Sequence, residues 1–408
     1  MTKHTVLTID DHEDNNLLIK YYLGKSFEVQ IAKSGKDGLD ILDKSNVEVV
    51  LLDIMMPGMN GYEVLDAMLA TPKLKNIPVI MVTARTEMED VREALTKGAF
   101  DYVKKPIDFT EIHHKINVAI KYKKQSDELS RISNYKQFYE GLIHARRLQQ
   151  SILPDKQFFR SIFPESFVID LPRDIISGDY YWVNARHSNK FLGAFDCTGH
   201  GVPGAMLSVM GNILMNKAIL QDGAISPKDI FRSLACDFNA SLNNSTDTYT
   251  IHDGMDGIFC SFNEEKKQIE YVSANRPLII IRDAKKPLFY NESMIEASLS
   301  DDKYSIYLLK GDMRSIGRES SAINFKNHVI DLCEDDIIYL FTDGITDQIN
   351  ECGKNLSKKK LLEFLLGIQD QSLKNQKVAL YNYIDSWRKD APQTDDILVI
   401  AVQYKSPQ

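Results

Sequence analysis

Residues 195–206 read FDCTGHGVPGAM, an aspartate at the end of an apolar run followed by a glycine-rich turn. The pattern predicts a strand that ends at Asp196 and a helix that begins near Pro203. A turn so poor in side chains lets a substrate and backbone carbonyls approach the carboxylate closely. A metal or phosphate site and an ordinary strand-to-helix corner both fit this stretch alone, so the rest of the chain decides between them.

Further acids lie beside apolar runs in the same half of the chain. Asp179 lies in SGDYYW, Asp343 in FTDGITD, and Asp395 and Asp396 in QTDDILV. A single Asp-Gly pair is usually a turn, but acids from several distant segments suit a site in which carboxylates surround two divalent cations. Such ions, about 4 Å apart, share a water and lower its pKa. The pattern favours Asp196 as a bridging ligand, with Cys197 contributing its backbone carbonyl rather than its thiol.

The chain after Pro154 alternates short apolar runs with a few helical stretches. The runs include FLGAFD, GIFCSFN, IEYVSA, PLIIIRD and DILVIAVQY, and the helical stretches include KKKLLEFLLGI and QKVALYNYIDSWRK. Several hairpins with helices between them are typical of an antiparallel α+β sandwich. We therefore expect the acids to be carried by the strands of such a sandwich.

The first 120 residues show a different pattern, a regular alternation of strand and helix. The runs TVLTID, FEVQIA, VEVVLLD, PVIMVT and FDYVKK are separated by amphipathic segments, which predicts a doubly wound parallel sheet. Ligands bind outside the carboxyl ends of the strands in such sheets. Asp10, Asp11, Asp53, Thr83 and Lys105 all fall at these ends.

These five residues predict a phosphoryl-transfer site on one rim of the sheet. Crowded carboxylates repel one another unless a hard cation such as Mg²⁺ neutralises them. One aspartate could then attack phosphorus while Lys105 and Thr83 hold the transferred oxygens. Any single acid at a strand end is as well explained as a helix N-cap, but that explanation fits the five together poorly.

The segments LTIDDHEDN, LLDIMMPGMNGYE, MVTAR and DYVKKP resemble the receiver domain of two-component response regulators, with its flavodoxin-like fold, over nearly all of residues 1–121. The resemblance implies that Asp53 accepts a phosphoryl group from a sensor histidine kinase. It implies that Asp10 and Asp11, with Asp53, bind Mg²⁺, and that Lys105 and Thr83 contact the phosphoryl group. Ala84 would leave space beside that group, and Tyr102 matches the aromatic switch position.

Residues 150–405 resemble the sporulation- and stress-type branch of the PPM (type-2C) serine/threonine phosphatases, through ISGDYYW, DCTGHGVPGAM, GMDGIF, SANRPL, YLFTDGITDQ and QTDDILV. The resemblance implies an αββα sandwich and a binuclear Mn²⁺ or Mg²⁺ centre. The implied metal ligands are Asp179, Asp196, Asp343 and Asp395, with Asp396 as an alternative to Asp395. A serine stands where many members have the first glycine of GGD, and Asp256 is expected to be structural.

His200 has two interpretations. It could act as general acid towards the leaving serine or threonine oxygen, or it could be a residue that starts the helix and packs there. A covalent cysteine nucleophile is not expected, because the five cysteines are irregularly spaced and the implied chemistry needs none.

Residues 122–153 are expected to form a linker helix between a receiver domain at 1–121 and a phosphatase domain at 154–405. One set of side chains recurs at threes and fours along this segment: Leu129, Ile132, Tyr135, Tyr139, Leu142, Ala145, Gln149 and Ile152. This spacing places them on one helix face. The face either packs on its own domain or forms a parallel coiled coil that makes a homodimer.

The composition excludes several classes of protein. A net charge of −8 argues against a nucleic-acid binder, and a DNA-binding regulator is further disfavoured by the lack of a basic recognition helix. No apolar run is long enough for a membrane span, and the first residues enter a strand without room for a signal peptide. Five unpatterned cysteines suit a reducing cytoplasm.

The predicted function is a response regulator that controls a metal-dependent phosphoserine/phosphothreonine protein phosphatase. The resemblance implies a phosphorylated anti-sigma-factor antagonist of the STAS type as substrate, in a partner-switching pathway. The alternative is a phosphorylation-gated scaffold that sequesters a regulatory partner without catalysis.

Overall fold

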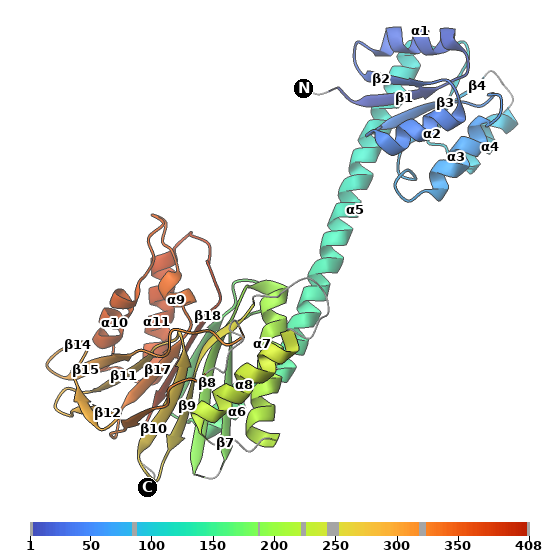
Figure 1. The fold of residues 1–408 in the computed structure, drawn as a ribbon. Coiled ribbons are helices and arrows are strands. Elements are labelled where there is room, and N and C mark those ends of the chain that lie inside the picture. Colours follow the sequence, from blue (N-terminus) through green and yellow to red (C-terminus); the bar gives the residue numbers. More distant parts are fainter. Residues whose placement is uncertain are drawn as a thin grey trace. The chain divides into compact units, whose positions relative to one another are not determined.

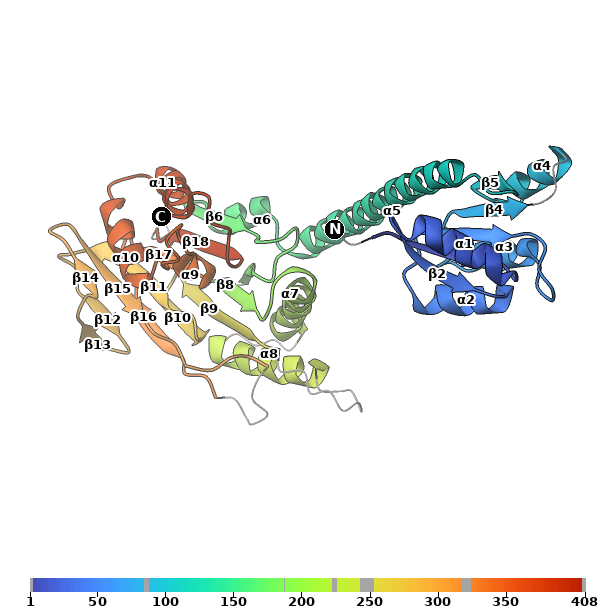
Figure 2. The ribbon, with the colours of Figure 1, turned by 90° about the horizontal axis from the view of Figure 1, so that it is seen from above.

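The computed structural model describes residues 3–83, 88–186, 188–221, 226–242, 253–317 and 324–405. The chain divides into two compact units, residues 1–139 and 140–408. The first is drawn in blue to cyan in Figure 1 and the second mainly in green to red; Figure 2 shows the same ribbon from above.

The N-terminal unit is built on a five-stranded parallel sheet with the strand order β2-β1-β3-β4-β5. The strands are β1 (Thr5–Ile9), β2 (Glu28–Ala32), β3 (Val49–Asp53), β4 (Val79–Thr83) and β5 (Asp101–Lys104). The helices between them are α1 (Glu13–Leu23), α2 (Gly35–Lys44), α3 (Gly61–Ala70) and α4 (Met88–Thr96). This is the doubly wound, flavodoxin-like fold that the sequence predicts, and its strand order reverses between β1 and β3.

The central strand of this sheet is buried on both faces. Val50 and Leu52 of β3 pack into one apolar cluster, whereas Val49 and Leu51 pack into another on the opposite face. Helices cover both faces of a parallel sheet, so such strands read as continuous apolar runs. The run VEVVLLD therefore ends with Asp53 at the carboxyl end of β3, on the rim of the sheet.

A single helix, α5 (Phe109–Ile152), runs from the N-terminal unit into the C-terminal unit. The predicted linker is helical, but the helix begins at Phe109, so the last receiver helix and the linker are one element. The boundaries 1–121, 122–153 and 154–405 stay a prediction, since the helix is unbroken between residues 121 and 122.

The apolar face of α5 is not uniform. Leu129 and Tyr135 are 68% and 70% exposed, whereas Gln149 is only 7% exposed and packs within the C-terminal unit. Of the two alternatives for this face, packing on its own domain therefore holds at Gln149. Its side-chain amide forms hydrogen bonds within its own unit. The exposed apolar side chains of this face include Leu129, Ile132, Tyr135 and Tyr139.

The C-terminal unit contains two antiparallel sheets. The seven-stranded sheet has the order β13-β12-β16-β10-β9-β8-β7 and the six-stranded sheet has the order β14-β15-β11-β17-β18-β6. The strands of the first are β7 (Tyr180–Arg186), β8 (Asn189–Cys197), β9 (Met255–Asn263), β10 (Gln268–Ala274), β12 (Leu288–Tyr290), β13 (Ser293–Ile295) and β16 (His328–Asp331). Those of the second are β6 (Ser166–Leu171), β11 (Leu278–Asp283), β14 (Leu299–Ser300), β15 (Tyr304–Leu309), β17 (Ile337–Phe341) and β18 (Ile397–Gln403).

Helices cover the outer faces of the two sheets. In Figure 1 α7 and α8 lie on one side of the sandwich and α10 and α11 on the other. The helices are α6 (Lys156–Ile162), α7 (Gly201–Asn216), α8 (Pro227–Leu242), α9 (Gly344–Asp347), α10 (Lys358–Gly367) and α11 (Leu373–Arg388), with a π-helical turn, η1, at Lys217–Gln221. The arrangement is the predicted αββα sandwich.

Alternation along single strands builds this layered core. In β9, Ile258 and Cys260 face the opposite sheet, while Phe259 between them faces α7 and α8. The period of two places successive side chains in different layers. Both layers are apolar, and the acids of the proposed site lie at or beside the ends of strands.

Among the residues that the structure describes, none of the helices has the length and apolar composition needed to cross a membrane.

Candidate active site

The first predicted site lies on the rim of the receiver sheet, where the strand order reverses. Asp10 follows β1 and Asp53 ends β3, and these strands are neighbours. Lys105 follows β5, and its Nζ lies 2.8 Å from Asp53 Oδ2 and 3.0 Å from Asp10 Oδ2. One ammonium group therefore joins the two carboxylates that the sequence assigns to phosphorylation and to metal binding.

Burial and neighbouring charge have opposite effects on the pKa of Asp53 and on that of Lys105. Burial raises the pKa of Asp53, and the hydrogen bond and positive charge of Lys105 oppose that rise without cancelling it. Burial alone would lower the pKa of Lys105, but its bonds to Asp53 and Asp10 raise it overall. Lys105 therefore stays protonated at neutral pH and offers hydrogen bonds to anionic oxygens at this point.

The donor set at this rim suits a hard cation. Asp10, Asp11, His12 and Asp53 each offer one ligand atom, and these atoms all lie within 4.8 Å of one another. Carboxylate oxygens are what Mg²⁺ prefers. The prediction did not include His12, which bonds Asp11 at 3.0 Å; its position directly after the two acids was the available signal.

Thr83 lies at the same rim, and Tyr102 lies two residues before the end of β5. Thr83 is buried at the end of β4, and its carbonyl accepts the backbone N–H of Lys105 at 2.8 Å. Tyr102 lies on β5 with its ring 5.0 Å from Lys115 Nζ. Ala84, which the sequence places beside the phosphoryl group, lies outside the described residues.

The second predicted site gathers acids from both sheets of the sandwich. Asp196 is near the end of β8, Asp179 directly precedes β7, Asp343 directly precedes α9, and Asp395 lies shortly before β18. Their charges act on one another: Asp196 and Asp395 both raise the pKa of Asp179 after burial, its largest cause. Residues far apart in the sequence thus form one acidic cluster.

Asp395 and Asp396 have different surroundings. The Asp396 carboxylate accepts the backbone N–H groups of Arg173 and Gly178, both at 2.7 Å. Asp396 is buried, whereas burial of Asp395 is partial and raises its pKa. Both oxygens of Asp396 are committed to the backbone, so Asp395 is the better placed of the two to face an ion.

Asp179 and Asp196 are the most deeply buried members of the cluster. Burial raises the pKa of each well above its usual range, and for Asp196 the nearby Arg276 opposes that rise. Thr342 Oγ1 donates to Asp179 Oδ2 at 2.6 Å. Such a concentration of buried carboxylates is stable only with compensating positive charge, which fits the oxygen-rich donor set of divalent cations.

Arg276 supplies positive charge to this cluster and was not predicted. Its Nη2 lies 2.6 Å from Asp196 Oδ2 and its Nη1 lies 2.7 Å from Asp343 Oδ2. It also approaches Asp256 Oδ2 at 3.3 Å. The segment SANRPL gave no signal for this role, because the contact depends on how β10 and β11 meet β8.

His200 lies at the start of α7 and bonds Asp174 Oδ2 through Nδ1 at 2.8 Å. Positive charge on His200 lowers the pKa of Asp395, which indicates that His200 is near the acidic cluster. Both interpretations of His200 therefore stand, a residue at the helix start and a group close to the acids. Burial and the neighbouring carboxylates raise the pKa of the Cys197 thiol well above its usual range, which disfavours a thiolate nucleophile.

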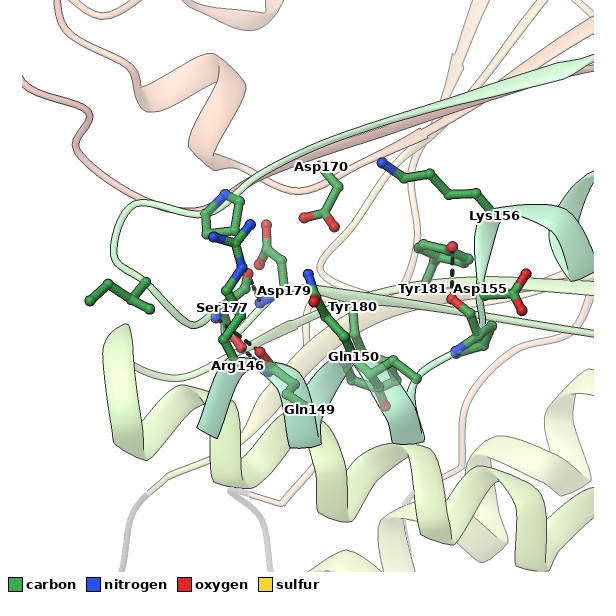
Figure 3. Close-up of a pocket in the computed structure, with 14 residues that line it drawn as sticks. Arg146, Gln149, Gln150, Asp155, Lys156, Asp170, Ser177, Asp179, Tyr180 and Tyr181 are labelled. Carbon is green, nitrogen blue, oxygen red and sulfur yellow. Dashed lines mark hydrogen bonds between the residues drawn. The ribbon is translucent and has the colours of Figure 1, made fainter. Parts of the chain in front are cut away.

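A pocket of about 280 Å³ lies between the end of α5 and the segment that carries Asp179 (Figure 3). Gln149 donates to the Ser177 carbonyl at 2.6 Å and to Ser208 Oγ at 2.8 Å. Figure 3 shows Gln149 directed toward Ser177, on the wall that also holds Asp179. The linker helix therefore bonds directly to the SGD segment, a contact that the sequence analysis missed.

Comparisons with known proteins identify different families in the two parts of the chain. Residues 6–117 match the response regulator receiver domain. Residues 190–405, more than half of the chain, match the Stage II sporulation protein E (SpoIIE) family, and the chain belongs to this family. It therefore joins a receiver domain to a SpoIIE-type, PP2C-like phosphatase domain.

A solved structure shares the fold of the C-terminal part. The SiaA-PP2C domain of Pseudomonas aeruginosa superposes with a TM-score of 0.56 and 23% identity, over 67% of this chain and 99% of that domain. At this identity the likeness is one of fold.

Two curated relatives match only part of the chain. A probable cyclic di-GMP phosphodiesterase of Vibrio cholerae is 33% identical over 135 residues, 33% of this chain and 31% of the relative. Response regulator SaeR of Staphylococcus aureus is 38% identical over 113 residues, 28% of this chain and 48% of the relative. The chain thus spans less than half the length of each relative.

Proposed function

We propose that this protein is a response regulator in which phosphorylation of Asp53 controls a metal-dependent phosphoserine/phosphothreonine protein phosphatase. The observation that carries the proposal is the meeting of Asp179, Asp196, Asp343 and Asp395, from separate segments, in one acidic cluster. The receiver rim, with Lys105 between Asp10 and Asp53, supports the regulatory half.

Each residue of the receiver rim has a task in phosphoryl transfer. Asp53 is the nucleophile towards phosphorus, and Asp10 and Asp11 hold Mg²⁺ beside it. Lys105 and Thr83 contact the phosphoryl oxygens, and Tyr102 changes its position in response to the added charge. A sensor histidine kinase is the proposed donor.

The phosphatase cluster has a different chemistry. When bound, two Mn²⁺ or Mg²⁺ ions supply the Lewis acidity for hydrolysis of a phosphomonoester. Asp179, Asp196, Asp343 and Asp395 hold them, with the backbone carbonyl of Cys197, and Asp396 anchors the loop of Asp179 through the Gly178 amide. We assign to His200, which bonds Asp174, the protonation of the leaving oxygen.

The partners follow from the family resemblance and from the linker. A phosphorylated anti-sigma-factor antagonist of the STAS type is the proposed substrate, in a partner-switching pathway in the cytoplasm. The exposed apolar side chains of α5, from Leu129 to Tyr139, favour a homodimer through this helix.

The deciding experiment is phosphate release from a phosphoserine or phosphothreonine peptide by the purified full-length protein. We expect turnover with Mn²⁺ and none with excess chelator. If tight, Asp53-dependent binding of an antagonist occurs without any turnover in Mn²⁺ or Mg²⁺, the scaffold hypothesis replaces the phosphatase.

A further inference from the structure

Arg276 contacts two of the four proposed metal ligands directly. It follows β10 and precedes β11, and its side chain is 11% exposed. Its two terminal nitrogens contact Asp196, on β8 of the seven-stranded sheet, and Asp343, at the start of α9. The guanidinium therefore joins two of the proposed ligands that come from distant segments of the chain.

The surroundings fix Arg276 in this position. Asp256 stands opposite Asp196 in the β8–β9 pairing and contacts Arg276 at 3.3 Å. Asp256 also accepts a hydrogen bond from the side chain of Asn275 at 3.0 Å. The Nε of Arg276 is buried and has no hydrogen-bond partner among the described residues, so the carboxylates alone hold the guanidinium.

A guanidinium ion and a metal ion compete for the same carboxylate oxygens. Arginine has no lone pair to offer a metal and remains charged in proteins. The oxygens that it holds, Asp196 Oδ2 and Asp343 Oδ2, are those of residues assigned to metal binding. A divalent ion at this point is also repelled by the guanidinium at short range.

The spacing of the acids agrees with this competition. Within the described parts of the chain, only the receiver set brings three or more such side chains together with all ligand atoms inside 4.8 Å. The phosphatase acids are more widely spaced, with a guanidinium among them. For metal ions to be held by Asp196 and Asp343, Arg276 has to leave at least one of these contacts.

We propose that Arg276 is a built-in competitor of the metal ions, which stabilises the acidic cluster itself and sets the concentration of divalent cation at which the phosphatase is loaded. The inference rests on the proposed metal site. Asp256 is the carboxylate to which Arg276 retreats, since it contacts the same nitrogen and is not among the assigned ligands.

The test measures Mn²⁺ binding to the full-length protein by isothermal titration calorimetry. All proteins carry Asp11→Asn, so that cation binding at the receiver rim is weakened equally. Arg276→Gln removes the charge and keeps a polar amide, and Arg276→Lys keeps the charge. Arg186→Gln removes a positive charge from the same unit at the far end of β7, where the guanidinium donates to the Ile219 carbonyl.

We expect Arg276→Gln to lower the Kd for Mn²⁺ at least ten-fold, equivalent to about 1.4 kcal/mol. The Kd of Arg276→Lys should remain closer to that of wild type, and the Kd of Arg186→Gln should equal that of wild type. An unchanged or weaker affinity in Arg276→Gln overturns the proposal. An equal decrease in Kd for Arg276→Gln and Arg276→Lys also overturns the proposal, because the charge of Arg276 is then not the cause.

Three further measurements separate the remaining outcomes. If Arg276→Gln is unstable with chelator, its thermal midpoint should rise on adding Mn²⁺ by more than that of wild type; an equal or smaller rise contradicts the competition. If Mn²⁺ affinity is unchanged but inhibition by inorganic phosphate weakens, Arg276 binds the substrate anion instead. If the Asp11→Asn protein with Arg276 intact binds no Mn²⁺ beyond a further Asp196→Asn variant, the proposed metal site itself has failed.

Discussion

Asp196 interacts with each of the other three members of the acidic cluster. Its charge acts on Asp179, while Asp343 and Asp395 act on Asp196. Arg276 is its direct ion-pair partner. A single carboxylate is thus close to acids from three other segments, as expected of the proposed bridging ligand.

We therefore expect Asp196→Asn to lower phosphatase turnover by at least about 100-fold, the scale on which metal sites respond even to loss of an outer partner. The amide preserves the volume, so circular dichroism should be unchanged. Asp370→Asn, which alters an exposed pair with Lys303 in the same unit, is the matched control. Wild-type turnover by a homogeneous Asp196→Asn protein would remove Asp196 from the metal site.

Cys197 follows Asp196 and tests a different part of the assignment. Its thiol is buried and its raised pKa keeps it protonated at neutral pH. We expect Cys197→Ala to keep turnover within about three-fold of wild type, a barrier change below 1 kcal/mol. Its backbone carbonyl is retained in this variant. Complete loss of activity in a folded Cys197→Ala protein would assign the thiol a chemical role.

The residues that were predictable from the sequence share a simple property. Asp53, Asp196 and Asp343 each stand at or beside the end of an apolar strand, and the ends of strands gather at the rims of sheets. Arg276 and Gln149 do not follow this rule. Their partners lie in other segments, and their positions depend on tertiary packing that periodicity does not encode.

The same difference appears among the secondary-structure elements. The strands of the receiver were predictable because a sheet covered on both faces requires continuous apolar runs. Strand β7, with the sequence YYWVNAR, was missed as a strand, although its Tyr180 and Trp182 face the helices. Strands β12, β13 and β14 contain only two or three residues, too few for an alternating pattern to show.

The end of helix α5 is the element that joins the linker to the phosphatase site. Gln149 donates to Ser177, whose hydroxyl in turn accepts the backbone N–H of Asp179 at 3.1 Å. Gly178, between them, donates to Asp396. A shift of the helix end therefore moves the segment that positions Asp179.

We expect Gln149→Ala to weaken this link and to make phosphatase activity less responsive to the receiver. The loss removes the shorter of the two hydrogen bonds to the Ser177 carbonyl and leaves the one from Ser208 Oγ at 3.4 Å, which costs about 1 kcal/mol of stability. The measurement is turnover with and without a beryllofluoride mimic of the phosphoryl group. Gln150→Ala, one exposed position further on, should respond as wild type. Equal responses of the two variants would contradict the link.

On the scale of the whole molecule, the two acidic sites are expected to be chemically independent. One forms an acyl phosphate on Asp53 and the other hydrolyses a phosphoester. We expect Asp53→Ala to abolish labelling by acetyl phosphate or a histidine kinase donor, whereas Asp179→Ala keeps it. Radiolabel retained after brief incubation measures both. Full labelling of Asp53→Ala would show that another residue is the nucleophile.

Coupling between the sites is expected to run through α5. A phosphoryl group on Asp53 adds charge and acceptor oxygens beside Lys105. Helix α5 starts shortly after Lys105 and ends at the contact with the Asp179 segment. We therefore expect the beryllofluoride mimic to raise phosphatase activity by changing how the exposed faces of two α5 helices pair.

The double variant Tyr139→Lys, Leu142→Lys tests this route, because it places charge on the apolar face of the helix and disfavours pairing of two chains. We expect the mimic to raise both the rate and the dimer fraction of wild type, measured by initial rates and analytical ultracentrifugation, and to change neither in the double variant. Glu128→Lys introduces the same side chain at an exposed acidic position of the same helix and should leave the response intact. If the double variant responds as fully as wild type, α5 is only a tether, and if the mimic changes neither quantity in wild type, the two domains are not coupled.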